Sequence, residues 1–353
     1  MKKKEEKELV GVKEIARRAN VAIATVDRVI NNRKGVSEKT KAKINAIIEE
    51  LNYKPNILAR RLASKETLMF AVLIPSVSKE TDYWEAPLEG ITQAQSEIVS
   101  YGIEIDKYFF DQNDTQSFLI ESRKILDKKY HGILLAPMFA KESAEFVSEC
   151  TRRSIPVVFI NSDLPDTPSL CYIGPDLYHA GGLAAHLCGY LIEEEDRILI
   201  VNISEIDNHR HFLRKEEGFK DYFYESKKSN AILKLDIKET NYKAISKELR
   251  KIFNSERVNL VFVPNSRVFY VAKFFEEYEI DNVRLIGFEF LAKNIKYLKK
   301  GTIDFLICQK PIEQGYRGIM TLYQHCVLKN RVKKVHYMPI DIITKKNYKF
   351  YSN

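Results

Sequence analysis

From residue 68 onward, short apolar runs alternate with amphipathic stretches, and no other feature of the sequence constrains the fold as much. The apolar runs span residues 69–75, 103–109, 132–136, 156–160, 197–203, 260–264, 283–288 and 303–308. Helical spacing of apolar residues predicts helices near 86–100, 115–129, 142–153, 177–192, 214–225, 243–254, 268–278 and 312–328. Alternating strands and helices favour parallel sheets covered on both faces, and a segment of about 280 residues favours two such lobes.

The first 65 residues differ from the rest of the chain in charge. They hold 17 Lys and Arg against 8 Asp and Glu, whereas the other 288 residues hold 39 against 40. The formal net charge of +8 is therefore confined to this N-terminal part. A compact cationic module joined to a near-neutral body is typical of a protein that neutralises DNA phosphates.

Three bursts of apolar residues at helical spacing predict a small three-helix domain over residues 10–54. The bursts are Ile15, Ala16 and Ala19, then Val26, Val29 and Ile30, then Ile44, Ile47, Ile48 and Leu51. Asn20 falls in the first turn, where a residue that tolerates positive φ is needed. Ser37 suits the N-cap of the third helix, and Glu38 follows near the positive end of its dipole. The pattern predicts a helix-turn-helix.

A second helix that begins near Ile23 would place its first residues at base edges in a major groove. Small or apolar side chains there suit thymine methyl groups, and Arg28 can reach a base or a phosphate. The DNA-contacting set that we expect in this domain is Ile23, Ala24, Thr25, Arg28 and Asn31. The alternative is a three-helix bundle that binds protein, but the local charge favours DNA.

Residues 55–66 predict a hinge helix and linker. Pro55 suits the first turn of a helix, and the apolar residues that follow leave Arg60 and Arg61 beside a protruding Leu62. An isolated helix of about nine residues is marginal in water, so we expect it to order only when paired and bound.

Residues 12–62 resemble the DNA-binding headpiece and hinge helix of the lactose/galactose repressor (LacI/GalR) family of transcriptional regulators. The resemblance implies a homodimer on a DNA operator, with Ile23 and Ala24 reading the major groove and Leu62 wedging a central base step. Asp27 departs from the serine that most members have. Its carboxylate would repel phosphate unless it pairs with Arg28 or Arg17 or faces away.

Residues 67–353 are similar to the periplasmic-binding-protein-like (type I) body of the same family. In such open α/β sheets, ligands bind beyond the carboxyl ends of the strands, here between the lobes. The resemblance implies an aromatic pair that sandwiches a sugar at Tyr83 and Trp84, and a cationic ligand residue at Arg214 or Lys215. Aromatic faces with amides and carboxylates suit a polyhydroxylated ligand. The effector-binding set that we expect is Tyr83, Trp84, Asn161, Lys215, Asn265, Glu289 and Gln309.

Each of these residues also has a purely structural interpretation. Trp84 could serve lobe packing, Asn265 and Gln309 could cap helices or turns, and Glu289 could face the N-terminus of the next helix. Glu289 stands where the family usually has aspartate, and Asn161 replaces part of the Asp-Arg pair of sugar receptors. The identity of the sugar is therefore left open.

Signals for other classes of protein are weak. The chain contains no Gly-x-Gly-x-x-Gly or Walker pattern, no His-x-x-x-His pair and no nucleophile elbow. The five cysteines form no Cys-x-x-Cys pair. We therefore expect no catalytic residues, no metal and no cofactor. The lysine-rich N-terminus precedes no apolar stretch, and no later run is long enough to span a membrane, so we expect a cytoplasmic protein.

The sequence thus predicts a homodimeric, sequence-specific DNA-binding regulator controlled by a small sugar-like effector. Two alternatives remain: a DNA-binding regulator without a functioning ligand site, and a sugar-binding receptor without DNA function. The operator, the regulated genes, the sign of the effector and any oligomer beyond the dimer are not given by the sequence.

Overall fold

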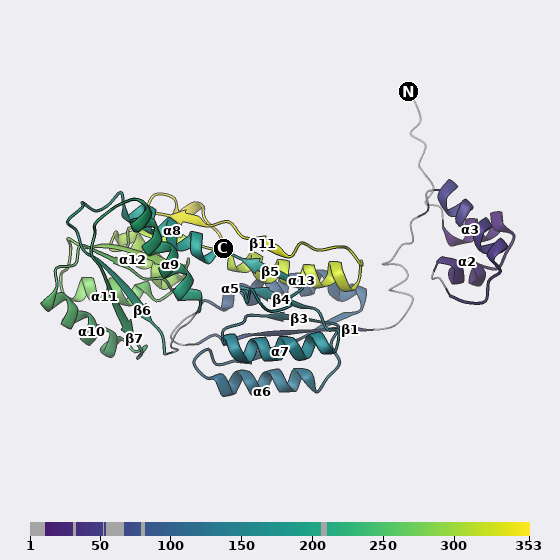
Figure 1. The fold of residues 1–353 in the computed structure, drawn as a ribbon, viewed down its shortest axis with the longest axis horizontal. Coiled ribbons are helices and arrows are strands. Elements are labelled where there is room, and N and C mark those ends of the chain that lie inside the picture. Colours follow the sequence, from purple (N-terminus) through teal and green to yellow (C-terminus); the bar gives the residue numbers. More distant parts are fainter. Residues whose placement is uncertain (1–10, 31–32, 52, 54–66, 79–81, 206–209) are drawn as a thin grey trace, which may run out of the picture. The chain divides into compact units, whose positions relative to one another are not determined.

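The computed structural model describes residues 11–30, 33–51, 53, 67–78, 82–205 and 210–353. The chain divides into two compact units, residues 1–66 and 67–353 (Figure 1). The predicted hinge segment, with Arg60, Arg61 and Leu62, lies outside the described residues, as does Asn31.

The first unit contains the three predicted helices, α1 Val12–Ala19, α2 Ile23–Ile30 and α3 Glu38–Glu50. Its buried core is Ile15, Ala16, Ala19, Val26, Val29, Ile44 and Ile47. Asn20 ends α1 with φ of 56°, and the Ser37 hydroxyl accepts a hydrogen bond from the Thr40 amide at 3.2 Å. Both predictions are confirmed: Asn20 ends α1 in the left-handed conformation, and Ser37 caps a free backbone amide at the start of α3.

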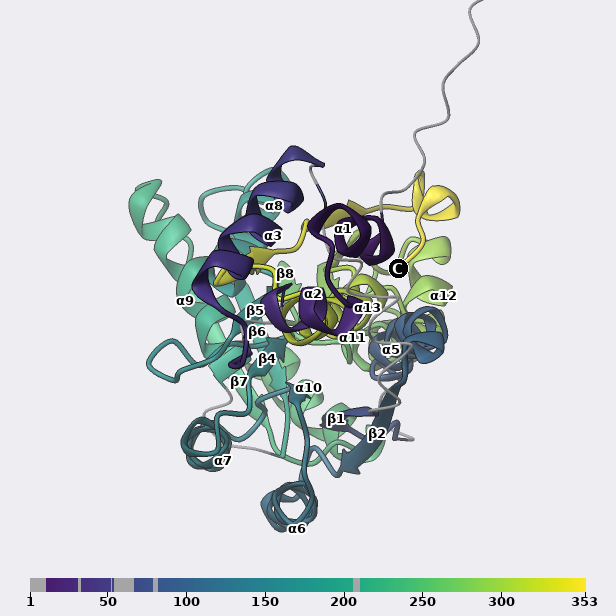
Figure 2. The same cartoon turned by 90° about the vertical axis from the view of Figure 1, so that its right-hand side faces the viewer.

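The first lobe of the second unit is a six-stranded sheet in the order β11-β5-β4-β3-β1-β2. Its strands are β1 Leu68–Pro75, β2 Ile103–Phe110, β3 Gly132–Leu135, β4 Val157–Ile160, β5 Cys171–Gly174 and β11 Val335–Tyr337, all parallel to their neighbours. Its helices are α5 Glu85–Ile98, α6 Thr115–Leu126, α7 Ala140–Arg152 and α13 Pro311–Cys326. Figures 1 and 2 show α6 and α7 next to each other, away from α5 and α13.

The second lobe is a six-stranded sheet in the order β12-β10-β9-β8-β6-β7. Its strands are β6 Ile198–Ile203, β7 Ile232–Ile237, β8 Leu260–Phe262, β9 Arg284–Phe288, β10 Phe305–Cys308 and β12 Asp341–Ile343. Its helices are α8 Leu177–Cys188, α9 Arg210–Glu225, α10 Tyr242–Ser255, α11 Val268–Glu277 and α12 Ala292–Lys300. Only β12, on β10, runs antiparallel among the described strand pairs.

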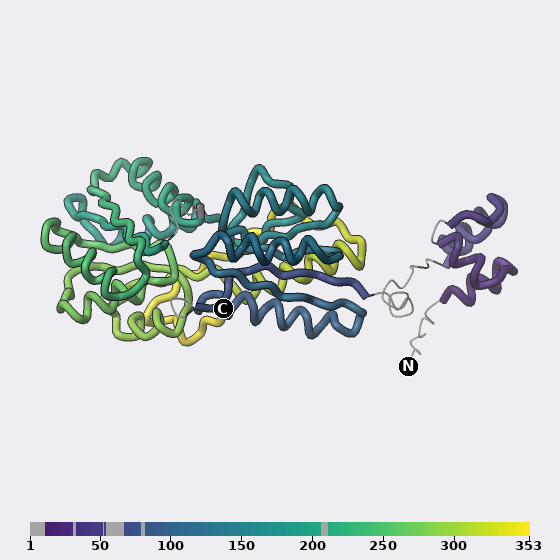
Figure 3. The backbone as a smooth tube through the Cα atoms, turned by 90° about the horizontal axis from the view of Figure 1, so that it is seen from below, coloured from purple at the N-terminus to yellow at the C-terminus, as the bar shows by residue number. Residues whose placement is uncertain are grey.

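Three segments of chain connect the two lobes, and they determine where the site lies. The first follows β5 and leads into α8, the second is Gln309 and Lys310 between β10 and α13, and the third joins β11 to β12. Figure 3 shows the lobes side by side, with the C-terminus near their junction. The Lys310 ammonium group donates there to the Ser352 carbonyl at 2.9 Å.

The predicted fold class is confirmed, but five elements of the body were missed: β5, β7, β11, β12 and α12. Strand β7 is half-exposed, because it lies at the edge of its sheet, and its apolar run is interrupted by Lys234 and Asp236. Strands β11 and β12 have three residues each, too few to produce a periodic signal.

Candidate effector cavity and DNA-facing helix

The outer face of α2 carries the residues that the sequence assigns to DNA. Ile23 is 49% exposed, Ala24 and Arg28 are exposed, and Thr25 is half-buried, whereas Val26 and Val29 pack into the core. A large apolar side chain in solvent at the start of this helix does not contribute to the core of the unit. The face is thus apolar at its start and cationic one turn later.

Asp27 pairs with a cation other than the two considered from the sequence. Its carboxylate lies 3.4 Å from the Arg33 guanidinium, and both side chains are about half exposed. Arg17 instead contacts Glu14 at 2.7 Å. The pairing with Arg33, which lies beyond the end of α2, was not among those considered from the sequence.

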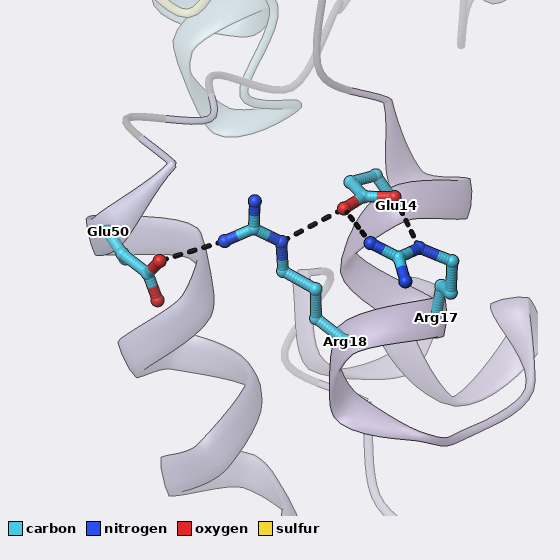
Figure 4. A network of polar contacts seen from close by, with 4 residues as sticks. All are labelled: Glu14, Arg17, Arg18 and Glu50. Atoms are coloured by element: carbon cyan, nitrogen blue, oxygen red, sulfur yellow. Dashed lines mark hydrogen bonds and ion pairs between the residues drawn. The ribbon is translucent and has the colours of Figure 1, made fainter.

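An ion-pair network joins α1 to α3 (Figure 4). The Arg18 guanidinium lies between Glu14 at 2.9 Å and Glu50 at 2.8 Å, and Arg17 shares Glu14. Hydrogen bonds from Arg17 and Arg18 lower the pKa of Glu14 to about 2. Because these side chains are exposed, the network orients the two helices more than it stabilises them.

A cavity in the second unit lies at the carboxyl ends of strands from both sheets. The open space that it encloses, together with the solvent at its mouth, amounts to about 490 Å³. Its wall consists of Tyr83, Trp84, Gln112, Met138, Asn161, His211, Phe212, Lys215, Asn265, Ser266, Arg267 and Glu289. Six of the seven effector residues expected from the sequence are in this wall, and Gln309 is not.

The first lobe contributes an aromatic pair held by an amide. Tyr83 and Trp84 pack edge to face with ring centroids 5.1 Å apart, and Trp84 is 2% exposed. The Asn161 side chain donates to the Tyr83 hydroxyl at 2.7 Å. Burial raises the pKa of Tyr83 well above its usual value, so the hydroxyl stays protonated.

The second lobe contributes a buried cation and a buried acid. The Lys215 ammonium group donates to the Pro264 carbonyl at 3.1 Å and lies 3.4 Å from the centre of the Phe288 ring. Burial lowers the pKa of Lys215 to about 7 and raises that of Glu289 to about 7, and each charge partly offsets the shift of the other. One carboxylate oxygen of Glu289 has no hydrogen-bond partner. A ligand with hydroxyl groups can supply that partner.

Glu289 adopts an unusual backbone conformation that its neighbours stabilise. Its φ is 75°, and the Asn294 side chain donates to the Glu289 carbonyl at 3.0 Å and to the Phe288 carbonyl at 3.0 Å. Asn294 is fully buried on α12. Because a left-handed glutamate is strained, these bonds are needed to hold its carboxylate in the cavity wall.

Asn265 and Arg267 share one acceptor at the end of β6. The Asn265 amide donates to the Ile203 carbonyl at 2.9 Å and the Arg267 guanidinium donates to the same oxygen at 2.8 Å. The Arg267 amide in turn donates to the Asn265 side-chain oxygen at 3.0 Å. Asn265 thus caps this turn, as its structural interpretation proposed, and also faces the cavity.

Six wall residues were absent from the expected set: Gln112, Met138, His211, Phe212, Ser266 and Arg267. Gln112 and Met138 follow β2 and β3, so the rule that ligands lie beyond strand ends would have found them. His211 and Phe212 lie on α9, one turn from Lys215, and only the three-dimensional structure brings them to the strand ends.

Gln309 is fully buried in the segment between β10 and α13. Neither its side-chain nitrogen nor its oxygen has a hydrogen-bond partner, and its carbonyl accepts from the Gln314 amide at 2.7 Å. The N-cap of α13 is Lys310, with φ of 52°. Gln309 therefore does not cap that helix, and it is not among the residues that line the cavity.

Among the residues that the structure describes, no three His, Cys, Asp or Glu side chains are grouped as metal ligands. The five cysteines are free thiols. None of the described helices has the length and apolar character needed to cross a membrane.

The geometry defines a class: a two-lobed α/β protein with a cavity at the carboxyl ends of both sheets, preceded in the chain by a helix-turn-helix unit. Residues 70–330 match the periplasmic binding protein domain, and residues 11–56 match the lacI family of bacterial regulatory proteins. The chain therefore belongs to the family of periplasmic binding protein domains, and its first unit carries a domain of the lacI family of bacterial regulatory proteins.

Individual relatives agree with this assignment. Catabolite control protein A of Staphylococcus aureus (strain Mu50) is 31% identical over 186 residues, 52% of this chain and 53% of the relative. The chain thus spans about half the length of the curated relatives it matches. A candidate LacI transcriptional regulator from Bacteroides fragilis has a TM-score of 0.76 and 27% identity, covering 81% of this chain and all of that one.

The cavity-bearing body also resembles sugar-binding proteins. GanP, a glucose-galactose binding protein from Geobacillus stearothermophilus, has a TM-score of 0.71 and 25% identity, covering 80% of this chain and 99% of GanP.

Proposed function

We propose that this protein is a sequence-specific DNA-binding transcription regulator whose second unit binds a small sugar-like effector. One observation carries the proposal. A helix-turn-helix with an exposed, apolar and cationic second helix occurs in the same chain as a cavity between two α/β lobes that is lined by aromatic and polar side chains. The proposal assigns no catalytic step, and the named relatives are regulators.

The DNA contacts belong to the first unit. We assign residues 10–54 to the helix-turn-helix domain, 55–66 to a hinge helix and linker, and 67–353 to effector binding and dimerisation. Two copies would place two α2 helices in successive major grooves of a pseudo-palindromic operator. The DNA-contacting set is Ile23, Ala24, Thr25, Arg28, Asn31, Arg60, Arg61 and Leu62.

The effector contacts belong to the cavity. Tyr83 and Trp84 offer ring faces and edges to the C–H surface of a sugar, while Asn161, Lys215 and Glu289 offer donors and an unpartnered acceptor to its hydroxyls. The likeness to GanP makes D-glucose and D-galactose the first compounds to test. Asn265 completes the wall, and Gln309 would act from the adjoining segment.

The effector would act through differential affinity for two arrangements of the lobes, of which only one suits DNA binding. The same linkage requires that DNA change effector affinity by the same factor. The protein would act in the cytoplasm, where the operator is.

A thermal-shift panel on the full chain, followed by DNA selection, tests the proposal. We expect at least one aldose or sugar derivative to raise the melting temperature, and we expect a random duplex pool to yield a pseudo-palindromic site. The selected sugar should change affinity for the selected duplex. DNA selection without any stabilising sugar would indicate a regulator that lacks a ligand site, and a stabilising sugar without DNA enrichment would indicate a receptor.

A further inference from the structure

A buried glutamine on α13 joins the cavity wall to a segment that connects the lobes. Gln314 is fully buried, and its side-chain oxygen accepts from the Asn161 backbone amide at 3.0 Å. Its side-chain nitrogen donates to the Gln309 carbonyl at 2.7 Å. The two ends of one side chain therefore hold two segments that lie about 150 residues apart in the sequence.

The hydrogen-bond chain continues from Asn161 to the aromatic pair. The Asn161 side chain donates to the Tyr83 hydroxyl at 2.7 Å, and Tyr83 packs against Trp84. Asn161 thus belongs to the cavity wall through its side chain and contacts Gln314 through its backbone. A ligand that displaces Tyr83 or Asn161 alters a group one bond away from Gln314.

Both ends of the Gln314 side chain hold backbone near a residue in the left-handed region. Asn161 has φ of 69°, and Lys310, directly after the Gln309 carbonyl, has φ of 52°. Asparagine tolerates this conformation, whereas lysine adopts it at a cost that the surrounding contacts must offset. Weakening the contact at one end therefore releases a constraint on a residue that has another conformation available.

The helix that carries Gln314 packs closely on α5, which limits how far it can shift. A Cβ atom added at Gly90 of α5 would lie 1.8 Å from the Ile312 carbonyl oxygen, and one added at Gly315 of α13 would lie 2.1 Å from the Pro87 carbonyl oxygen. The backbones of α5 and α13 are thus in direct contact. Movement at Asn161 must then be taken up by the Gln314 side chain and the segment it holds.

We propose that Gln314 is a positioning residue that transmits the state of the cavity wall to the inter-lobe segment at Gln309 and Lys310. Its regulatory meaning rests on the proposed function, because that segment determines how the lobes are joined. The coupling itself is a property of the protein without effector or DNA, and it is tested in that state.

The test measures hydrogen exchange of the amides of residues 309–314 by mass spectrometry on the full chain. Tyr83→Phe removes the hydroxyl that Asn161 contacts, at the far end of the chain of bonds. Tyr108→Phe is the matched control, since it removes a hydroxyl bonded at 2.6 Å to Tyr130 elsewhere in the same lobe. Both substitutions are made in three backgrounds: wild type, Gln314→Leu and Gln314→Glu.

The two Gln314 variants break the chain of bonds differently. Gln314→Leu removes both bonds. In Gln314→Glu an ionised carboxylate retains an acceptor for the Asn161 amide but has no proton to donate to the Gln309 carbonyl, so exchange is measured on the alkaline side of neutrality. If the leucine variant fails to fold, the glutamate variant decides the test, because it keeps the shape of the side chain.

In the wild type we expect Tyr83→Phe to speed exchange at residues 309–314 by at least about three-fold, and Tyr108→Phe to leave it unchanged. In either Gln314 variant, Tyr83→Phe should not speed exchange at residues 309–314 any further. If the two substitutions acted independently, Tyr83→Phe would speed exchange equally in every background. An unchanged segment in the wild type, or an equal effect in all backgrounds, overturns the proposal. Neither result depends on whether a sugar or an operator is found.

Discussion

Lys215 and Glu289 bring opposite charges into the buried cavity wall without forming an ion pair within the described part of the chain. Each is fully or almost fully buried, and burial rather than their mutual attraction dominates both pKa values. Such a pair is costly for the free protein and useful for a polar ligand, which restores hydrogen bonds that folding removed.

We expect the contribution of this pair to stability to be lowest near neutral pH. The folded pKa of Glu289 is raised, so the folded state binds more protons than the unfolded state between about pH 4.5 and 7, and stability falls as pH rises through that window. The folded pKa of Lys215 is lowered, so stability rises between about pH 7 and 10.5. Urea unfolding at about pH 5, 7 and 9 measures both slopes.

In Glu289→Gln the fall between about pH 5 and 7 should shrink by about 2 to 3 kcal/mol relative to the wild type, because the titrating group is gone. A variant with the wild-type slope in this window would show that Glu289 keeps its ordinary pKa.

Trp84→Ala should weaken effector binding by roughly 10- to 100-fold, because it removes one of the two rings of the aromatic pair in the cavity wall. Calorimetric titration with the sugar that stabilises the wild type gives the affinity. Phe350→Ala is the control, since Phe350 is 89% exposed and lies outside the cavity wall. Equal affinities in the two variants would place the effector elsewhere.

At the scale of the element, the exposed face of a helix can bind a partner while its buried face packs in the core. In α2 the residues exposed to solvent are those assigned to DNA, and the residues between them form the core. Helices α5 and α13 contact each other at glycines, and because glycine has no Cβ atom the two backbones can touch there.

Ile23→Ala should lower affinity for the selected duplex by about five- to ten-fold, from the loss of one apolar base contact. It should change the free energy of unfolding by less than about 0.5 kcal/mol, since Ile23 is half exposed. Val26→Ala, fully buried on the same helix, should instead cost about 1 to 3 kcal/mol of stability. Chemical unfolding and DNA titration of both variants separate the two effects, and similar profiles would contradict the assignment of the faces.

Gly315→Ala should destabilise the protein by about 1 to 3 kcal/mol or more, because the new methyl group meets a carbonyl oxygen of α5. Gly182→Ala on α8 is the matched control, where the nearest atom, the Gly218 oxygen, lies 3.6 Å away. There the higher helix propensity of alanine should raise stability by up to about 1 kcal/mol. Urea unfolding that ranks the two variants in the opposite order would show that α5 and α13 are not in backbone contact.

Elements buried on both faces were predictable, and elements at the edges were not. Strand β1 is a continuous apolar run because both faces of its sheet are covered, whereas β7 alternates like a surface strand. Most of the cavity wall followed from strand ends, but Gln314 did not, because its role depends on a tertiary contact between Asn161 and α13. Gln309 lies outside the residues that line the cavity, in the segment that leads to α13, and its contact with the effector stays a prediction.

At the scale of the whole molecule, charge is distributed between the two units by task. Residues 1–65 carry nine more cationic than anionic side chains (17 less 8), and the remaining residues carry one more anionic (39 less 40). Association with DNA phosphates can thus involve the first unit without attracting the body to the duplex.

DNA affinity should therefore depend steeply on salt. A protein that makes six to ten phosphate contacts is expected to lose roughly 10³- to 10⁵-fold in affinity between about 50 and 200 mM salt. Filter binding at several salt concentrations measures this dependence for the full chain. As the control, residues 67–353 alone should show no salt-dependent binding to DNA. A flat affinity of the full chain would contradict the electrostatic contribution of the first unit.

Trp84 is the only tryptophan among 353 residues, and it lies in the wall of the cavity beside Tyr83. Any indole emission from this protein therefore originates at one position, so the native chain carries its own optical reporter for the cavity. Titration with an operator duplex could be followed at this same indole, with no label attached. If its emission changes when DNA is added, then DNA binding at the first unit alters the surroundings of Trp84 in the effector cavity.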